Sequence, residues 1–283
     1  MKLPIDVSLN GKVAVLTGAG GVIGAHFAKV LSKAGATVVV TDLKQDAAQK
    51  VVDSIQEEGG NAVAVGVNVL EPSSLLEARN TITAEFGGID ILINGAGGNH
   101  PKATTAKEVL EAVDLGPHEL PTFFDLDPEG IKFVFDLNFL GTLLPTQVFT
   151  PMMVGREGAT IINISSMNAF RPLTKIPAYS AAKAAVSNFT QWLAVHFAPV
   201  AIRVNAIAPG FFATNQNQTL LYDELGQLTE RSQKILSHTP MNRFGEVSDL
   251  TGTLLWLASH EASGFVNGIV VPVDGGFAAY SGV

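Results

Sequence analysis

Three side chains in the middle of the chain have the types and the spacing that proton transfer requires. Lys183 follows Tyr179 by four residues, and Ser166 precedes the tyrosine by thirteen. Residues four apart lie on one face of a helix, so the lysine cation can stand beside the tyrosine. A phenol has a pKa of about 10, and a nearby cation lowers it by favouring the phenolate. The spacing therefore predicts a tyrosine that acts as a general acid or base.

A glycine-rich segment from Thr17 to Gly24 predicts a site for a phosphate-containing ligand. Glycines let the backbone turn sharply and approach a pyrophosphate, and a helix N-terminus after the turn presents free N–H groups to it. The other interpretation is a tight turn without a ligand.

Asp42 lies twenty-four residues beyond Gly18, at the end of the next apolar run. A carboxylate there is placed to accept hydrogen bonds from the ribose of a dinucleotide, although it could also be a helix N-cap. Because a carboxylate repels a 2′-phosphate, we expect NAD(H) rather than NADP(H) as the cofactor. Lys44 nearby could soften that preference.

The apolar pattern predicts alternating strands and helices. Short runs rich in β-branched residues predict seven strands, at 13–16, 37–41, 62–67, 89–93, 160–164, 202–207 and 269–273. Stretches with an apolar face at helical spacing lie between them, at 22–34, 46–58, 73–86, 130–153, 178–197 and 247–259. This alternation predicts an α/β fold in which helices cover both faces of a doubly wound, seven-stranded parallel sheet.

Nothing in the sequence divides its 283 residues, so we expect a single domain over 1–283. Two long connections, at about 97–129 and 211–243, follow predicted strands. Long connections in a compact domain commonly form lids or binding loops, and ligands bind at the carboxyl ends of strands in such sheets. We therefore expect both connections to contact the substrate.

Composition excludes several classes of partner. The net charge is −8 and no basic run offsets it, which argues against nucleic acid and anionic membranes. The chain has no cysteine, and its six histidines lack paired metal-ligand spacing, so we expect no metal site. No apolar stretch approaches the roughly 18 residues of a membrane span, and no signal segment is evident. These features together predict a cytoplasmic protein.

The motifs resemble, in order and spacing, those of the short-chain dehydrogenase/reductase family over essentially the whole chain. They are the Gly-rich turn, Asn94-Gly95-Ala96-Gly97, Asn138, Ser166, Tyr179 with Lys183, and Pro209-Gly210. The resemblance implies a Rossmann fold and an NAD(H)-dependent enzyme that acts on a CH–OH group. Three positions depart from the family pattern, because Val22 and Gly95 replace a glycine and an asparagine, and Asn68 replaces an aspartate.

The resemblance also implies roles for the predicted catalytic residues Asn138, Ser166, Tyr179 and Lys183. Tyr179 would exchange the proton of the substrate hydroxyl, and Ser166 would hydrogen-bond the same oxygen. Lys183 would lower the tyrosine pKa and bind the nicotinamide ribose, while Asn138 would hold a water that links the lysine to solvent. A serine or asparagine in these places could instead cap backbone groups. The expected cofactor-binding residues are Gly18, Gly20, Gly21, Val22, Ile23, Asp42, Asn68, Val69, Asn94, Ala96, Gly97, Tyr179, Lys183, Pro209, Gly210, Phe212 and Thr214.

The segment between Asn94 and Asn138 is longer than is usual in the family. This segment and those that follow resemble the D-mannonate oxidoreductase (fructuronate reductase) branch, which implies interconversion of D-mannonate and D-fructuronate. Basic side chains could hold the carboxylate of such a sugar acid, and amides could bind its hydroxyls. Each of these groups could equally be solvated at the surface. The candidate substrate residues are His100, Lys102, Asn168, Arg171 and Asn215, with Lys175, Gln216 and Asn217 as further possibilities.

Two other functions remain open at this point. A polyol dehydrogenase or other carbonyl reductase of the same family would prefer neutral substrates. A non-catalytic NAD-binding regulator could share the fold, although the complete catalytic set argues against it. The predicted helices at 130–153 and 178–197 resemble those that pair in the family's oligomers, so we expect a homo-oligomer, either a dimer or a tetramer.

Overall fold

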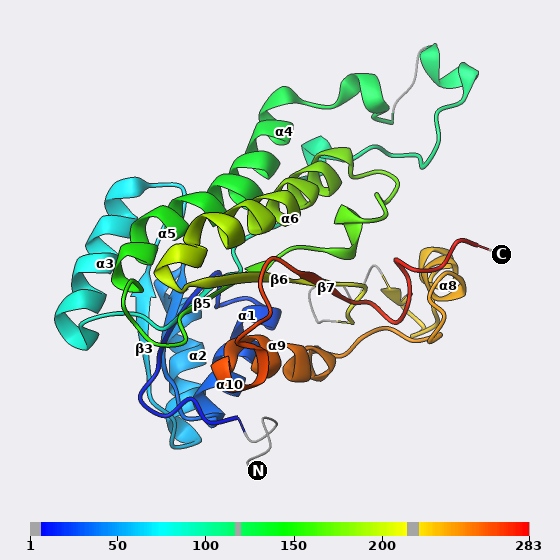
Figure 1. The fold of residues 1–283 in the computed structure, drawn as a ribbon. Helices are drawn as coiled ribbons and strands as arrows, with labels where there is room; N and C mark the ends of the chain where they lie inside the picture. Colours follow the sequence, from blue (N-terminus) through cyan, green and yellow to red (C-terminus); the bar gives the residue numbers. More distant parts are fainter. Residues whose placement is uncertain (1–6, 117–119, 214–220, 283) are drawn as a thin grey trace.

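The computed structural model describes residues 7–116, 120–213 and 221–282. In these residues the predicted α/β fold is confirmed, because one sheet of seven parallel strands runs in the order β3-β2-β1-β4-β5-β6-β7 (Figure 1). The strands are β1 (Val13–Thr17), β2 (Thr37–Asp42), β3 (Ala62–Gly66), β4 (Ile91–Asn94), β5 (Thr160–Ile164), β6 (Arg203–Pro209) and β7 (Val270–Val273).

The central strands are apolar because helices cover them on both sides. Every residue of β1, β4 and β6 is buried. Val15 lies opposite Val39 of β2 and Leu92 of β4, so β-branched and aliphatic side chains form continuous rows across the sheet. Such rows suit parallel strands that are packed on both faces.

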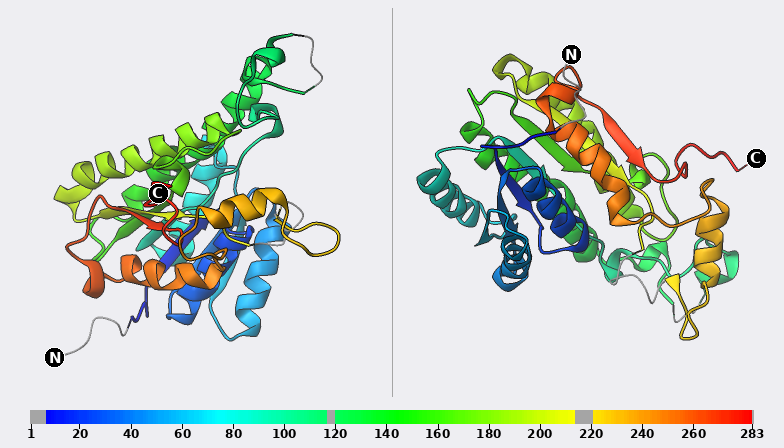
Figure 2. Two further views of the ribbon diagram at one scale, coloured as in Figure 1. Left: turned by 90° about the vertical axis from the view of Figure 1, so that its right-hand side faces the viewer. Right: turned by 90° about the horizontal axis from the view of Figure 1, so that it is seen from below.

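Two helical layers enclose the sheet (Figures 1 and 2). On one face lie α1 (Val22–Lys33), α2 (Gln45–Glu57), α9 (Thr251–Ala258) and α10 (His260–Ser263). On the other lie α3 (Pro72–Phe86), α5 (Gly141–Phe149) and α6 (Pro177–Phe197). Phe27 of α1 and Leu254 of α9 belong to the first apolar core, whereas Phe149 of α5 and Leu193 of α6 belong to the second. This is the doubly wound arrangement expected from the sequence.

The helix predicted at 130–153 is not uniform. It consists of α4 (Pro128–Phe135), a π-helical turn (Asp136–Leu140), α5 and a 3₁₀ turn (Thr150–Met152). A π turn adds one residue to a helical turn and is commonly found at functional sites. An apolar pattern at helical spacing does not reveal such an insertion, so the prediction missed it. The helix predicted at 247–259 likewise begins with a 3₁₀ turn (Val247–Leu250) before α9.

The two long connections leave the carboxyl edge of the sheet. Residues 98–116 and 120–127, here called the arm, contain 3₁₀ turns at Pro101–Ala103, Ala112–Leu115 and Phe123–Asp125 and project away from the body (Figure 1, upper right). The second connection contains a helix that the sequence analysis did not predict, α8 (Glu230–Ser237), which Thr229 caps by accepting the Ser232 N–H at 3.2 Å. Short 3₁₀ turns at Met167–Ala169 and Ala198–Val200 flank α6. No helix in the described ranges is long and apolar enough to cross a membrane.

Candidate active site

The glycine-rich turn lies where the sheet order changes direction, because β1 has β2 on one side and β4 on the other. This switch point is where ligands bind in doubly wound folds. Gly18 has a φ of 63°, and a Cβ there would lie 2.8 Å from the Ala96 Cα. A Cβ on Gly24 would lie 2.7 Å from the Ala19 Cα. Glycine is therefore required at both positions for the turn to pack against the loop after β4 and for α1 to pack against the turn.

The start of α1 fits a pyrophosphate. Gly21 is the N-cap, and a glycine has no side chain that could accept a hydrogen bond from the first N–H groups of the helix. Uncapped N–H groups and the positive end of the helix dipole make this a favourable place for an anion. Val22, which departs from the family pattern, is the first residue of α1 and has no left-handed backbone angle. The departure therefore introduces no strain.

The Asp42 carboxylate is held by two backbone groups at the end of β2. Its Oδ2 accepts from the Gly20 N–H at 3.1 Å and its Oδ1 from the Lys44 N–H at 3.0 Å. The N-cap of α2 is Lys44, so Asp42 is not the cap of that helix. The carboxylate faces the glycine turn, as the dinucleotide hypothesis requires. A hollow of about 750 Å³ beside Gly20 is lined by Lys29, Lys44 and Lys50.

Some predicted cofactor residues have side chains that are committed to the protein itself. Asn94 is buried, and its Nδ2 donates to Thr146 Oγ1 at 2.9 Å and to Asn163 Oδ1 at 2.8 Å. Asn68 Oδ1 accepts from the Leu70 N–H at 3.1 Å. Val69 packs in the second core. The Asn94 amide nitrogen is therefore fully used, whereas its buried Oδ1 has no hydrogen-bond partner in the described residues. Any polar contact of Val69 with a cofactor must come from its backbone.

The serine, tyrosine and lysine meet at the carboxyl end of β5. Ser166 lies two residues beyond the end of this strand and hydrogen-bonds Tyr179 of α6. Lys183 is buried one helical turn later, where its Nζ donates to the Ile164 carbonyl at 2.8 Å and lies 5.7 Å from the centre of the Tyr179 ring. The predicted spacing thus brings the three side chains together on one wall of a cavity.

Burial has opposite effects on the two titratable groups. It raises the pKa of Tyr179, and the hydrogen bond from Ser166 offsets only part of that rise. It lowers the pKa of Lys183 from 10.5 to about 8. The spacing of Tyr179 and Lys183 predicts a lowered tyrosine pKa, but the net direction in the protein is upward, because the effect of burial is the larger one. The lysine ammonium donates to the Ile164 carbonyl and lies 5.7 Å from the centre of the phenol ring.

The π turn places Asn138 against the loop after β4. The amide is fully buried, its Oδ1 accepts from the Gly98 N–H at 3.2 Å, and its Nδ2 donates to the carbonyls of Gly98 and Val134, both at 2.7 Å. A Cβ on Gly97 would lie 2.7 Å from Asn138 Oδ1 and 3.1 Å from Lys183 Nζ. Asn138 is therefore a neighbour of the lysine and fixes the backbone of this loop.

A cavity of about 220 Å³ joins these parts. Its lining comes from the glycine turn, the loop after β4, the end of β5, α6 and the end of β6, and includes Thr17, Ile23, Gly24, Gly97, Ser166, Tyr179, Lys183, Pro209 and Gly210. Gly210 donates its N–H to the Val273 carbonyl at 2.9 Å. The Phe212 side chain is buried in the first core. Thr214 and Asn215 lie outside the described residues.

The structure separates the candidate substrate residues. Lys102 is ion-paired with Asp127 at 2.9 Å, and His100 accepts the Lys102 N–H and packs against Phe133. Neither lines the 220 Å³ cavity. Asn168 is buried, and its Oδ1 has no hydrogen-bond partner in the described chain.

Arg171 lines a second cavity of about 270 Å³ together with Arg231, Lys234 and His238. Arg231, Lys234 and His238 are not among the residues predicted from the sequence, because no helix is predicted in the connection at about 211–243. A basic residue at every third or fourth position of α8 is the signal that could have found them.

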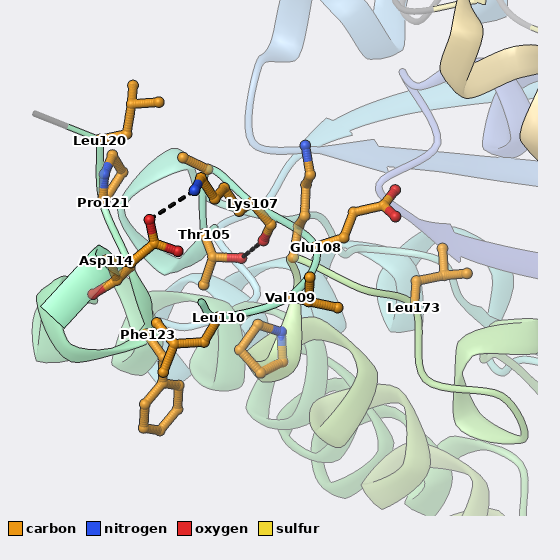
Figure 3. Close-up of a pocket in the computed structure, with 14 residues that line it drawn as sticks. Thr105, Lys107, Glu108, Val109, Leu110, Asp114, Leu120, Pro121, Phe123 and Leu173 are labelled. Atoms are coloured by element: carbon orange, nitrogen blue, oxygen red, sulfur yellow. Dashed lines mark hydrogen bonds and ion pairs between the residues drawn. The ribbon is translucent and has the colours of Figure 1, made fainter. Parts of the chain in front are cut away.

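A further cavity, of about 530 Å³, lies between the arm and residues 173–177 (Figure 3). None of the predicted catalytic residues lines it. Lys107 closes one side by its ion pair with Asp114 at 2.7 Å, and the Glu108 carboxylate points away from that pair (Figure 3). Glu108 instead pairs with Lys234 of α8, so the arm and the second connection are in contact.

Comparison with known proteins agrees with this geometry. The short chain dehydrogenase family profile matches residues 12–225. An uncharacterized oxidoreductase of Haemophilus influenzae is 57% identical over 100% of this chain and 99% of its own length. An uncharacterized oxidoreductase of Bacillus subtilis (strain 168), UxuB, is 50% identical over 99% of this chain and 100% of its own length.

A solved structure extends the likeness to three dimensions. It is a proposed D-mannonate oxidoreductase of Haemophilus influenzae with bound NAD, 56% identical, with a TM-score of 0.94 and full coverage of both chains. The range matched by the family profile includes the glycine turn and Ser166, Tyr179 and Lys183. The chain belongs to the short-chain dehydrogenase family and is an oxidoreductase that acts on a CH–OH group.

Proposed function

We propose that the protein transfers hydride between NAD(H) and a sugar acid, with D-mannonate and D-fructuronate as the substrate pair. The observation that carries the enzymatic part is the single cavity in which Ser166, Tyr179 and Lys183 face the glycine-rich turn. The substrate part is supported by the similar Haemophilus influenzae structure, which is a proposed D-mannonate oxidoreductase with bound NAD.

The side chains divide the proton chemistry between them, while the bound nicotinamide supplies or accepts the hydride. Because burial raises its pKa, the Tyr179 hydroxyl keeps its proton and can donate it to the carbonyl oxygen of D-fructuronate. In the oxidative direction the same oxygen takes the proton of the D-mannonate hydroxyl. Ser166 hydrogen-bonds Tyr179 and is placed to bond the reacting oxygen as well.

Lys183 is the next group along this path. Its pKa of about 8 lets it release a proton near neutral pH, and the Ile164 carbonyl fixes its position. Asn138 serves as a positioning residue, because its amide holds Gly98 and its Oδ1 lies beside Gly97 next to the lysine.

Asp42 supports NAD(H) rather than NADP(H), since its carboxylate faces the turn where the adenosine ribose would lie. Lys29, Lys44 and Lys50 line the neighbouring hollow, and their charges oppose the effect of Asp42 by attracting a 2′-phosphate. Steady-state rates with NADH and NADPH at equal concentrations measure the cofactor preference directly.

A substrate panel tests the whole proposal. The purified protein is assayed by NADH absorbance with D-fructuronate, D-fructose and simple ketones, and in reverse with D-mannonate, other aldonates and polyols. We expect the highest kcat/KM for D-fructuronate and D-mannonate. A neutral polyol as the best substrate would instead identify a polyol dehydrogenase, and absence of turnover together with NAD binding would identify a regulator.

We also propose a cytoplasmic homo-oligomer that associates through α6. The outward face of this helix carries the small residues Ala181 and Ala184 and then Trp192 and Val195, which are 56% and 78% exposed. Small and apolar side chains along one exposed helix face suit packing against a second helix. Light scattering should show a dimer or tetramer for the wild type and a smaller species for Trp192→Glu.

A further inference from the structure

The cavity of about 270 Å³ between α8, the segment after Ser166 and the C-terminal segment has an unusual charge. Arg171, Arg231 and Lys234 face it, and Glu108 is the one carboxylate among its lining residues. The chain as a whole carries a net charge of −8. A concave site with an excess of cations on an acidic protein favours an anionic ligand. Its volume lies near the lower end of the range for ligand pockets, which suits a small molecule.

The two arginines retain unused donors. Arg171 donates from Nε to the Ala278 carbonyl at 3.1 Å, which holds the side chain and leaves both Nη atoms without a partner in the described residues. Arg231 projects from the first turn of α8 and makes no ion pair within the described residues, whereas Lys234 of the same helix pairs with Glu108. A guanidinium presents its donors in a planar fork that matches a carboxylate.

The Glu108 carboxylate shows that this cavity favours an anion. Glu108, which belongs to the arm, forms an ion pair with Lys234. The hydrogen bond from Lys234 lowers the Glu108 pKa, and the charges of Lys175 and Arg231 lower it further. A carboxylate from a distant segment is thus already held at the edge of the cation cluster.

His238 and two aromatic rings supply the remaining wall. The Nδ1 atom of His238 lies 2.8 Å from the Lys234 carbonyl, which can only accept, so this nitrogen carries a proton and Nε2 remains available to a hydroxyl. The Phe211 and Phe277 rings pack edge to face, with their centres 5.3 Å apart. This combination of cations, an acceptor and apolar rings fits a polyhydroxylated acid.

The cavity adjoins the catalytic one. Gly210 lines the catalytic cavity and Phe211 lines this one, and consecutive Cα atoms are about 3.8 Å apart. The segment that carries Arg171 begins at Ser166 and ends at Tyr179, so one short stretch of chain borders both cavities. In D-fructuronate, three hydroxylated carbons separate the reacting carbonyl from the carboxylate, so the carboxylate of a bound molecule must lie away from Tyr179, in a neighbouring part of the site.

We propose that this cavity binds the carboxylate of the acid substrate, and that Arg171 and Arg231 are the residues that distinguish a sugar acid from the matching neutral sugar. The inference rests on the proposed function, because it assumes that the substrate is an acid. Beyond the proposed function, it identifies the residues that bind the carboxylate and gives α8 a role in substrate binding.

The test compares D-fructuronate with D-fructose, which differs from it by a CH₂OH group in place of the carboxylate. Arg171→Gln and Arg231→Gln are assayed with both substrates, and Arg231→Lys serves as the conservative variant. Arg79→Gln, on α3, is the matched control for loss of one positive charge. NADH binding, followed by its fluorescence, checks that each variant is folded and binds its cofactor.

We expect each arginine-to-glutamine change to raise the KM for D-fructuronate about 10- to 100-fold, as loss of a charge-assisted hydrogen bond implies. The kcat/KM for D-fructose and NADH binding should stay within about twofold of wild type, and Arg231→Lys should recover part of the affinity. A wild type that turns over D-fructuronate, with an unchanged KM in both variants, overturns this inference and leaves the proposed function intact. A wild type that prefers neutral sugars to every acid overturns both.

Discussion

Replacing Lys183 should have opposite effects on two properties of the protein, because the buried lysine lowers the free energy of unfolding but is needed for turnover. Its ammonium group is buried and donates to the Ile164 carbonyl, and burial lowers its pKa from 10.5 to about 8. Such a depression means that keeping the charged form buried costs about 3 kcal/mol at pH 7. Lys183→Met removes that cost with a flexible side chain of similar length, but leaves the carbonyl without its donor, at a cost of about 1–2 kcal/mol.

We therefore expect Lys183→Met to be more stable than the wild type by about 1–2 kcal/mol at pH 7, while it loses turnover. The difference should shrink as the pH rises. Between about pH 8 and 10.5 the unfolded lysine holds its proton and the folded one does not, so wild-type stability increases with pH there. The wild type should recover about 2 kcal/mol relative to the variant between pH 7 and 9.5.

Urea unfolding at a fixed protein concentration, followed by tryptophan fluorescence, measures both quantities. Lys33→Met removes an exposed lysine paired with Glu58, and as a control it should change stability by less than about 1 kcal/mol. A Lys183→Met variant that is less stable than the wild type at pH 7 and shows the same pH dependence would refute the reasoning. In that case the lysine is not held in the protein as a costly buried cation.

Three further changes probe the cofactor and catalytic groups. Tyr179→Phe should lower kcat by about 10²- to 10⁴-fold while NADH binding by fluorescence is retained; unchanged turnover would exclude the tyrosine as the acid. Asp42→Ala should raise kcat/KM for NADPH relative to NADH, because the carboxylate that repels a 2′-phosphate is gone and three lysines line the adjacent hollow; an unchanged ratio removes Asp42 from cofactor choice. Gly97→Ala should lower kcat at least about tenfold, since its Cβ would lie 2.7 Å from Asn138 Oδ1. Gly98→Ala should lower kcat less, because its Cβ meets only Leu137 at 3.7 Å, although Gly98 also lines the catalytic cavity. Equal effects of the two alanines would contradict this.

The strands could be predicted from the sequence because a doubly covered parallel sheet demands continuous apolar runs. The largest disagreements are at β4, predicted at 89–93 and observed at Ile91–Asn94, and at β6, predicted at 202–207 and observed at Arg203–Pro209. Ile89 is buried, as its type suggests, but its N–H bonds to the Met152 carbonyl outside the ladder. Apolar character reports burial and does not report which acceptor a backbone N–H finds.

The parts of the site that sequence could not supply depend on tertiary contacts. Helix α8 has few apolar residues, and the ion pair between Lys234 and Glu108 of the arm fixes it in place. The spacing of Tyr179 and Lys183 predicts that the two side chains lie together. It does not predict their burial, which raises the pKa of the tyrosine and lowers that of the lysine. Residue type likewise could not reveal that Lys102, a candidate substrate residue, forms an ion pair with Asp127.

The π turn also has a consequence for how the helix tolerates a change of length. Its hydrogen bonds span five residues instead of four, so the turn absorbs one extra residue between α4 and α5. Deleting one residue between Asp136 and Leu140 would restore a regular α-helix and leave the two helices in nearly the same relative orientation. Asn138 would then lose the backbone position from which its amide holds the Gly98 carbonyl. The sheet and its two cores would keep their places, so a single-codon deletion there would act on the loop beside Lys183 and leave the fold unchanged.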